Sequence, residues 1–329
     1  MIVDLFAGPG GADEGARIAG YTGPIVGIER DRDACRTATA AGHWRVQADV
    51  ATYPTAPFAG KIDGLWASPP CQSFSQAGKR GGLADPRGEL VWQPLRWATE
   101  LRPRFVALEQ VEEVLPIWQI VAARLRELGY STWTGKLLAA DYGVPQTRTR
   151  AVLAARLDGV AVPPAPTHAA DDGMDLFGSQ LPPWINMAEA LGWSDEVAYR
   201  RSRGAGLAER HGDRPDTPAS RPAPTITGKS RSDVWVLTRP ATTVCGDPRI
   251  GRPGHKAWDK GEGQFQNGSV PVTVEEAAVL QSFPADYPWQ GSKSSRHQQV
   301  GNAIPPLLAA AILRPLLADA AAGAAHEVA

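Results

Sequence analysis

Cysteine is scarce in this chain of 329 residues, which contains only Cys35, Cys71 and Cys245 and no CxxC pair. Neither a disulfide framework nor a zinc site is indicated, and this usage is typical of proteins from a reducing compartment. Long apolar runs are lacking as well, because the apolar stretch at residues 307–317 is short and is interrupted by Arg314 and Pro315. We therefore expect a cytoplasmic protein without a membrane segment.

A large excess of charge of one sign is also absent, since the formal net charge is −1. The distribution is uneven, however: residues 200–260 contain thirteen Lys and Arg against six Asp and Glu. A cationic segment on an anionic body is the footprint expected for binding a phosphate backbone, although a solvated loop region gives the same balance. Hydrophobic residues at 43% and charged residues at 21% argue against a disordered chain.

A polar loop that displays a thiol follows the short apolar run at residues 64–66. Its sequence is Ser68-Pro69-Pro70-Cys71-Gln72-Ser73-Phe74-Ser75. The two prolines fix φ and lack backbone donors, so they end the strand and hold Cys71 in a rigid turn. A buried structural cysteine is the alternative, but neighbouring polar side chains would need hydrogen-bond partners in a core. We therefore expect Cys71 to act as a nucleophile.

A glycine-rich turn, Ala7-Gly8-Pro9-Gly10-Gly11, follows the apolar strand predicted at residues 2–6. The next predicted strand ends in Glu29, where a carboxylate can accept both ribose hydroxyls in a Rossmann-type unit. Asp49 follows a third strand and is placed to meet an adenine amino group. The full GxGxxG is absent, and a glycine turn can simply join a strand to a helix. Because no basic residue lies near the turn, we expect a ligand without phosphates, and S-adenosyl-L-methionine is the candidate.

Charged side chains also occur at the ends of later predicted strands. Glu109 ends the strand predicted at residues 104–108, where open α/β sheets bind their ligands. Arg148 and Arg150 alternate in an extended segment, so both could face a phosphate or a base edge. Structural ion pairs would explain the two arginines equally well.

The composition changes at about residue 159 to Pro, Gly, Asp, Arg and Trp, and it changes back at about residue 269. We expect an α/β fold with a Rossmann-like sheet at residues 1–158, a loop-rich second domain at 159–269, and the first domain resumed at 270–329. The resumed part is predicted to contain helices at 274–283 and 307–317, joined by a loop as far as Gln299. Two near copies, residues 221–226 and 239–244, are either paired strands or a chance similarity.

Taken in order, these stretches resemble the DNA (cytosine-5)-methyltransferase family along the whole chain. The stretches that carry the resemblance are Asp4-Leu5-Phe6-Ala7-Gly8-Pro9-Gly10-Gly11, Pro69-Pro70-Cys71-Gln72, Glu109-Gln110-Val111, Gln146-Thr147-Arg148-Thr149-Arg150, residues 273–284 and Gly301-Asn302-Ala303. The resemblance implies a Rossmann-like S-adenosylmethionine-dependent methyltransferase sheet with a second, smaller loop-rich target-recognition domain at 159–269.

The resemblance also implies methyl transfer to C5 of a cytosine that is flipped out of double-stranded DNA. Cys71 would add to C6, Glu109 would stabilise charge at N3 and the exocyclic amine, and Arg148 would hold the carbonyl oxygen or a phosphate. Two residues depart from the family pattern: Gln110 replaces the usual Asn, and Pro271 stands about where Arg is frequent. The shape of the base pocket, the identity of the donor and one support of the recognition domain are therefore open.

The residues expected at the site form three groups. The catalytic group is Cys71, Gln72, Glu109 and Arg148. The cofactor-binding group is Asp4, Phe6, Gly8, Gly10, Gly11, Glu29, Arg30, Asp49, Val50, Pro70 and Asn302. The DNA-binding group is Ser73, Ser75, Lys79, Arg80, Arg150, Arg221, Lys229, Arg231 and Arg239. No metal site is expected.

Two other functions are compatible with these motifs. A transfer-RNA cytosine-5 methyltransferase shares nearly all of them, but its region corresponding to residues 159–269 is shorter. A DNA-binding protein that has lost catalysis would not need Cys71, Glu109 and Arg148. We expect a monomer, since one flipped base needs no second subunit, bound to double-stranded DNA of the nucleoid. A cognate restriction endonuclease, where one exists, would act separately.

Overall fold

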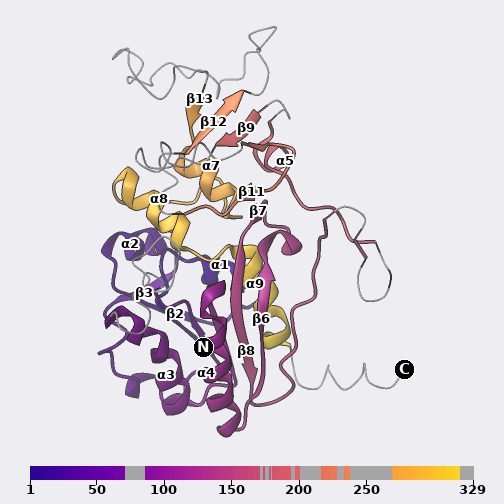
Figure 1. Cartoon of the computed structure of the whole chain (residues 1–329). Coiled ribbons are helices and arrows are strands. Elements are labelled where there is room, and N and C mark those ends of the chain that lie inside the picture. The colour runs from indigo at the N-terminus through magenta and orange to yellow at the C-terminus, as the bar shows by residue number, and fades with distance from the viewer. Residues whose placement is uncertain are drawn as a thin grey trace.

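The structure of the protein is a computed structural model that describes residues 1–70, 86–170, 173–174, 178, 180–193, 197–200, 216–227, 233–237 and 269–318. A seven-stranded sheet forms its lower part in Figure 1, with the strand order β3-β2-β1-β4-β5-β8-β6. The strands are β1 Ile2–Leu5, β2 Ile25–Glu29, β3 Trp44–Gln47, β4 Gly64–Ala67, β5 Phe105–Val111, β6 Ser131–Leu138 and β8 Thr149–Arg156. The predicted α/β fold with a Rossmann-like sheet is confirmed.

The direction of the strands defines the edge at which a ligand can bind. Strands β1 to β5 are parallel, and β8 runs antiparallel between β5 and β6. The strand order reverses between β1 and β4, which makes their carboxyl ends the topological switch point of the sheet. Because β8 runs the other way, its amino end lies at this same edge.

Helices cover both faces of the sheet, so the central strands are continuous apolar runs. One face packs against α3 Gln93–Leu101 and α4 Leu115–Glu127, through Trp97 and Trp118. The other face packs against α1 Gly11–Ile18 and α9 Pro306–Leu317. The helix α2 Arg32–Ala40 and short 3-10 helices also belong to this part: η1 Ala56–Phe58, η3 Pro86–Trp92, η4 Glu112–Val114 and η5 Ala139–Tyr142.

A smaller four-stranded sheet lies above the first in Figure 1, in the order β10-β9-β12-β13. Its elements are β9 Val197–Arg200, β10 Thr217–Pro218, β12 Val234–Leu237 and β13 Ser269–Pro271, with the helices α5 Met187–Leu191, α7 Val274–Val279 and α8 Lys293–Asn302 beside them. One apolar cluster joins Tyr199 and Trp235 of this sheet to Phe283 and Val300. The packing clusters therefore do not follow the predicted boundary at residue 270, and the domain limits remain a prediction.

The first of the two near-copy segments contains β11 Ala223–Pro224, which pairs in parallel with β7 Gln146–Thr147. This pairing joins the second part of the chain directly to the segment that precedes β8. The second copy, residues 239–244, lies outside the described residues.

The loop predicted between residues 284 and 299 is wrong, because α8 Lys293–Asn302 occupies its last part. Ser292 caps the helix by accepting from the Ser295 N–H, and the buried face contains the polar residues His297 and Gln299. Hydrophobic periodicity cannot reveal a helix whose inward face is polar. Gln299 is satisfied there by a hydrogen bond from the Thr37 hydroxyl at 2.6 Å.

The stretch Lys293–Leu317 is long and apolar enough to cross a membrane by length and composition alone, because its most apolar window has a mean hydropathy of 1.5. Of its most apolar window, 72% is buried inside the protein, as in a core helix.

Glycine allows α1 to lie unusually close to the returning chain that precedes and includes α9. A Cβ built on Gly15 would lie 2.5 Å from Ala309 Cβ and 2.8 Å from the Pro306 carbonyl oxygen. One on Gly11 would lie 2.2 Å from the Ile304 carbonyl oxygen. These distances are shorter than real Cβ contacts, so the two segments can approach this closely only where α1 has no side chains.

We expect Gly15→Ala to lower the free energy of unfolding by about 1–3 kcal/mol through overpacking. A decrease would be informative, because helix propensity alone predicts an increase: alanine is the better helix former by about 1 kcal/mol in an exposed helix. Urea unfolding followed by tryptophan fluorescence measures the change. Gly159→Ala is the control, since the nearest atom to its Cβ would lie at 3.6 Å. Equal stability of the two variants would mean that α9 moves away at no cost.

Candidate active site

The residues predicted at the site converge on one edge of the sheet because of the strand directions. The glycine turn follows β1, Glu29 ends β2, Asp49 follows β3, and Pro69 follows β4. Glu109 lies near the end of β5, and Arg150 lies near the start of the antiparallel β8, paired with Val111.

The turn after β1 is held in a conformation that L-residues rarely adopt. Phe6, Gly8 and Gly10 have φ values of 59°, 53° and 116°. A side chain on Gly8 would meet no atom of the described residues within 4 Å, whereas one on Gly10 would lie 2.5 Å from His43 and from Tyr287. Gly8 therefore borders open space into which a ligand can fit, and Gly10 is glycine because of packing. Gly11, close to Ile304, is a packing glycine as well.

Glu29 is tied to this turn through both carboxylate oxygens. Its Oε2 accepts from the Gly8 N–H at 2.9 Å, and its Oε1 accepts from the Asp31 N–H at 2.6 Å. Each carboxylate oxygen can accept a further hydrogen bond, so Glu29 retains the capacity to bind ribose hydroxyls. The open face of Gly8 and this carboxylate fit a nucleoside-bearing cofactor.

Of the remaining predicted cofactor residues, Arg30, Asp49 and Val50 follow β2 and β3, and Asn302 comes from the end of α8. Asp49 accepts from the Ala51 N–H at 2.9 Å and lies 3.7 Å from Arg30, whose side chain is exposed. Val50 is buried, and Asn302 is exposed at the end of α8. The contacts of these residues with a cofactor stay predictions.

Asp4 lies beneath the turn and differs from the other cofactor candidates. Only 2% of its surface is exposed, and within the described residues neither carboxylate oxygen has a hydrogen-bond partner. Burial, with the nearby Asp13 charge, raises the pKa of Asp4 well above its usual value. Asp4 is therefore a buried residue of β1, and its predicted contact with a cofactor stays a prediction.

The segment that leads to Cys71 is anchored by Gln110, the residue that departs from the family pattern. The Gln110 amide donates to the Pro69 carbonyl oxygen, and its own oxygen accepts from the Val111 N–H. The side chain is buried, so β5 fixes the end of β4 directly. Cys71, Gln72, Ser73, Ser75, Lys79 and Arg80 lie outside the described residues.

The buried carboxylate of Glu109 forms an ion pair with Arg150. Arg150 Nε lies 2.9 Å from Glu109 Oε1, and the two side chains are 10% and 6% exposed. An arginine–carboxylate pair that is shielded from water is held much more firmly than a surface pair. It fixes a carboxylate and a guanidinium at the edge of the sheet where β5 ends and β8 begins.

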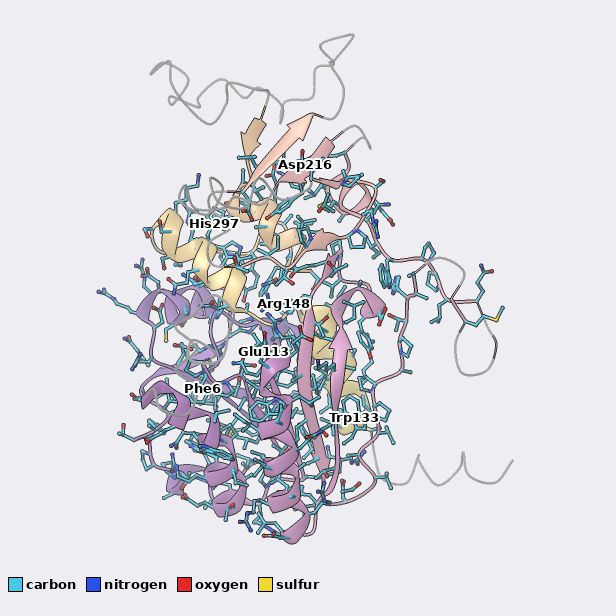
Figure 2. All side chains as sticks on the ribbon, in the orientation of Figure 1. Phe6, Glu113, Trp133, Arg148, Asp216 and His297 are labelled. Carbon is cyan, nitrogen blue, oxygen red and sulfur yellow. The ribbon has the colours of Figure 1, made fainter. Side chains whose placement is uncertain are left out.

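Arg148 lies between β7 and β8, where the strand is interrupted, and its hydrogen-bond partners differ from those of Arg150. Its guanidinium donates to the carbonyl oxygens of Ile226 at 3.0 Å and Gly301 at 3.2 Å. Figure 2 shows Arg148 at the level where the large sheet meets the upper part of the molecule. Arg148 is therefore a buried connection between three segments, whereas Arg150 pairs with Glu109, and the prediction that the two arginines face a phosphate or a base edge is untested.

Sequence reasoning missed the glutamines that complete this connection. Gln146 donates to Gln281 Oε1 at 3.0 Å and accepts from the Ile226 N–H at 3.0 Å. Gln281 in turn donates to the Val300 carbonyl oxygen. The sequence contains a signal for Gln146, which begins the motif Gln146-Thr147-Arg148-Thr149-Arg150. The sequence analysis predicts roles for the two arginines of that motif and none for the glutamine.

Of the predicted DNA-binding residues beyond Arg150, the structure describes Arg221. Its exposed side chain helps to line a cavity of about 220 Å³, together with Thr147, Trp184, Asp216, Thr217, Pro218, Pro222 and Pro224. Lys229, Arg231 and Arg239 lie outside the described residues.

The chain belongs to the C-5 cytosine-specific DNA methylase family, whose sequence profile matches residues 1–171 and 226–318. Type II methyltransferase M1.HphI of Haemophilus parahaemolyticus is 33% identical over 341 residues, covering 96% of this chain and 86% of the relative. Type II methyltransferase M.Eco47II of Escherichia coli is 26% identical and covers 94% of this chain and 77% of the relative. The resemblance found in the sequence is confirmed.

Solved structures support the fold. A mutant of DNMT2 from Spodoptera frugiperda superimposes with a TM-score of 0.66 at 16% identity, covering 96% of this chain and 99% of the other. The Dnmt2 methyltransferase of S. pombe gives 0.64 at 16% identity, covering 96% and 97%.

We expect Arg148→Met to lower the free energy of unfolding by about 2–3 kcal/mol, because two buried carbonyl oxygens lose a charged donor. Arg124→Met is the control: this arginine is 62% exposed in an ion pair with Glu127. Its loss is expected to cost less than about 1 kcal/mol. Urea unfolding of both variants measures the difference, and equal losses would contradict the anchoring role.

We expect Asp4→Asn to gain stability relative to the unaltered protein as the pH rises from about 4. The pKa of Asp4 is raised in the folded protein, so the unfolded chain releases a proton that the folded chain retains, and raising the pH favours unfolding. The asparagine side chain of the variant carries no such proton. Urea unfolding at several pH values measures the difference.

Asp158→Asn is a control of opposite sign. A hydrogen bond from Arg156 lowers the pKa of Asp158, so this carboxylate stabilises the protein above its unfolded pKa and loses that effect as the pH falls. The Asp158 variant should therefore lose stability near neutral pH and match the unaltered protein in acid. Parallel pH profiles for the two variants would exclude this account of Asp4.

Proposed function

We propose that this member of the family transfers a methyl group from S-adenosyl-L-methionine to C5 of a cytosine flipped out of a specific double-stranded DNA sequence. One observation carries the proposal: the buried Glu109–Arg150 pair lies at the ligand-binding edge of the sheet, and the next residue, Gln110, donates to Pro69 in the segment that leads to Cys71. Family membership and the position of Glu29 next to the open face of Gly8 support it.

The chain's residues supply covalent activation of the ring. C5 of cytosine is a weak nucleophile, so the Cys71 thiolate adds to C6 and makes C5 electron-rich. Glu109, sharing a proton with the ring, hydrogen-bonds N3, accepts from the exocyclic amine and stabilises the charge that develops there. After methylation at C5, a base removes the C5 proton, and Cys71 leaves by β-elimination. The donor supplies an electrophilic methyl group when it is bound.

Arg150 takes over the role that the sequence assigned to Arg148. Its guanidinium fixes Glu109, and we propose that it contacts the pyrimidine carbonyl oxygen of the target base. The guanidinium of Arg148 donates to carbonyl oxygens of Ile226 and Gly301 instead. We therefore assign Arg150 to the target base and Arg148 to the junction beneath it.

The second part of the chain would bind the duplex and read the flanking base pairs. Its cationic balance between residues 200 and 260, with exposed Arg221, supports phosphate contacts. Such contacts weaken with salt through counterion release. We propose that the protein acts as a cytoplasmic monomer on DNA, independently of any restriction endonuclease; the names of its type II relatives support a modification role.

The test is to incubate the purified protein with S-adenosyl-L-methionine and unmethylated duplex DNA and to analyse the nucleosides by mass spectrometry. We expect 5-methyl-2′-deoxycytidine, and we expect Cys71→Ser to abolish it because the C6 adduct cannot form. Cys35→Ala is the matched control, since burial raises the pKa of the Cys35 thiol to about 11 and makes it a poor nucleophile.

The alternatives give different products. Methylated cytidine in transfer RNA with unmodified DNA would indicate the transfer-RNA enzyme. Specific DNA binding without product would indicate a silent DNA-binding protein. Loss of product in Cys35→Ala but not in Cys71→Ser would overturn the assigned nucleophile.

A further inference from the structure

The glycine turn after β1 accepts hydrogen bonds from side chains that come from distant parts of the chain. Three successive carbonyl oxygens of the turn, those of Ala7, Gly8 and Pro9, accept from buried donors. Arg45 of β3 donates to Gly8 at 3.3 Å and to Ala7 at 3.5 Å. The Tyr287 hydroxyl donates to Pro9 at 2.6 Å.

Arg45 is itself fixed by a buried ion pair. Its Nη2 lies 2.6 Å from Asp13 Oδ2, and both side chains are 1% exposed. Burial opposes ionisation of Asp13, but the Arg45 guanidinium outweighs it and lowers the pKa of Asp13. Because Asp13 belongs to α1, Arg45 joins β3 to both the turn and the helix that follows it.

Tyr287 is fixed by packing between aromatic rings. Its ring packs against Phe283 at 4.9 Å and Trp289 at 5.0 Å between ring centroids. Burial raises the pKa of Tyr287 far above its usual value, so the hydroxyl keeps its proton and remains a donor. The same hydroxyl would lie 2.5 Å from a Cβ on Gly10, so it defines the position of that residue too.

We infer that Tyr287 and Arg45 are positioning residues that hold the turn in the shape that accepts the methyl donor. The turn needs such support, because Phe6 at φ 59° is a bulky residue in the left-handed region, which is costly without surrounding constraints. Holding the three carbonyl oxygens inward keeps the open face of Gly8 toward the ligand and Gly8 N–H on Glu29. This inference rests on the proposed cofactor site.

The protein offers a matched pair of tyrosines for the test. Tyr130 is buried and donates to the Pro103 carbonyl oxygen at 2.7 Å, far in sequence from the turn. Tyr287→Phe and Tyr130→Phe therefore each remove one buried tyrosine-to-proline hydrogen bond and keep the ring. Similar losses in thermal unfolding midpoint are expected for both variants, so any difference in ligand binding reports the turn.

Calorimetric titration with S-adenosylhomocysteine measures the effect. We expect Tyr287→Phe to raise the dissociation constant about threefold to tenfold, the factor for one neutral hydrogen bond. Tyr130→Phe should bind within twofold of the unaltered protein, and DNA affinity should be unchanged in both variants. Comparable dissociation constants for the two variants would overturn the inference.

Hydrogen exchange of the peptide that covers residues 5–15 tests the same inference without a ligand. Faster exchange in Tyr287→Phe, and not in Tyr130→Phe, is expected when the turn loses its anchor. Unchanged exchange in both variants would contradict the inference. If the unaltered protein fails to bind S-adenosylhomocysteine, the proposed cofactor site fails, whereas exchange still decides whether Tyr287 holds the turn. Arg45→Lys, which keeps the charge but loses the planar fork, should reproduce both effects.

Discussion

The close approach of α1 to the returning chain is the constraint on which the rest of the structure depends. Gly11 and Gly15 lack the side chains that would separate α1 from Ile304 and α9. Because α9 covers one face of the large sheet, this contact closes the core and brings residues 287–304 against the glycine turn. The second part of the chain is thereby inserted between two segments that must meet.

Polar groups carry the connection between the two parts of the molecule. Arg148, Gln146 and Gln281 link β7 to the segments around Ile226 and Gly301 through buried hydrogen bonds. Trp235 of the small sheet donates to Glu276, which also closes the capping box of α7 with Thr273. Buried polar bonds require particular partners and geometry, so they define the relative position of the two sheets more sharply than apolar contact alone.

The sequence predicted the large sheet well, because its central strands are short apolar runs followed by glycine or proline turns. It also predicted that Glu29 and Glu109 would lie at the same edge, since this follows from parallel strands. The helix α8 escaped prediction because its buried face is polar. The different partners of Arg148 and Arg150 were not predicted, because alternation assumes one continuous strand. In the structure the strand is interrupted at Arg148, between Thr147 and Thr149.

Residues that support the site were also hidden from sequence reasoning. Arg45 lies in a short strand with no recognisable motif, and Tyr287 lies in a segment predicted as loop. The sequence predicts that Gly10 and Gly11 bind the cofactor; the structure adds that side chains there would meet His43, Tyr287 and Ile304. A glycine pattern indicates positions where a side chain does not fit. Only the fold shows whether a ligand or the protein itself occupies the space that the side chain would take.

The hydrogen bond between Tyr287 and Pro9 spans 278 residues of sequence, and this separation governs when the site is assembled. During synthesis the glycine turn leaves the ribosome long before its anchor and α9. Closing the long loop between Pro9 and Tyr287 is a late event in folding. Until α9 packs, one face of the sheet formed by the first strands is uncovered. The turn at the proposed site for the methyl donor therefore gains its anchor only after the second part of the chain has been made.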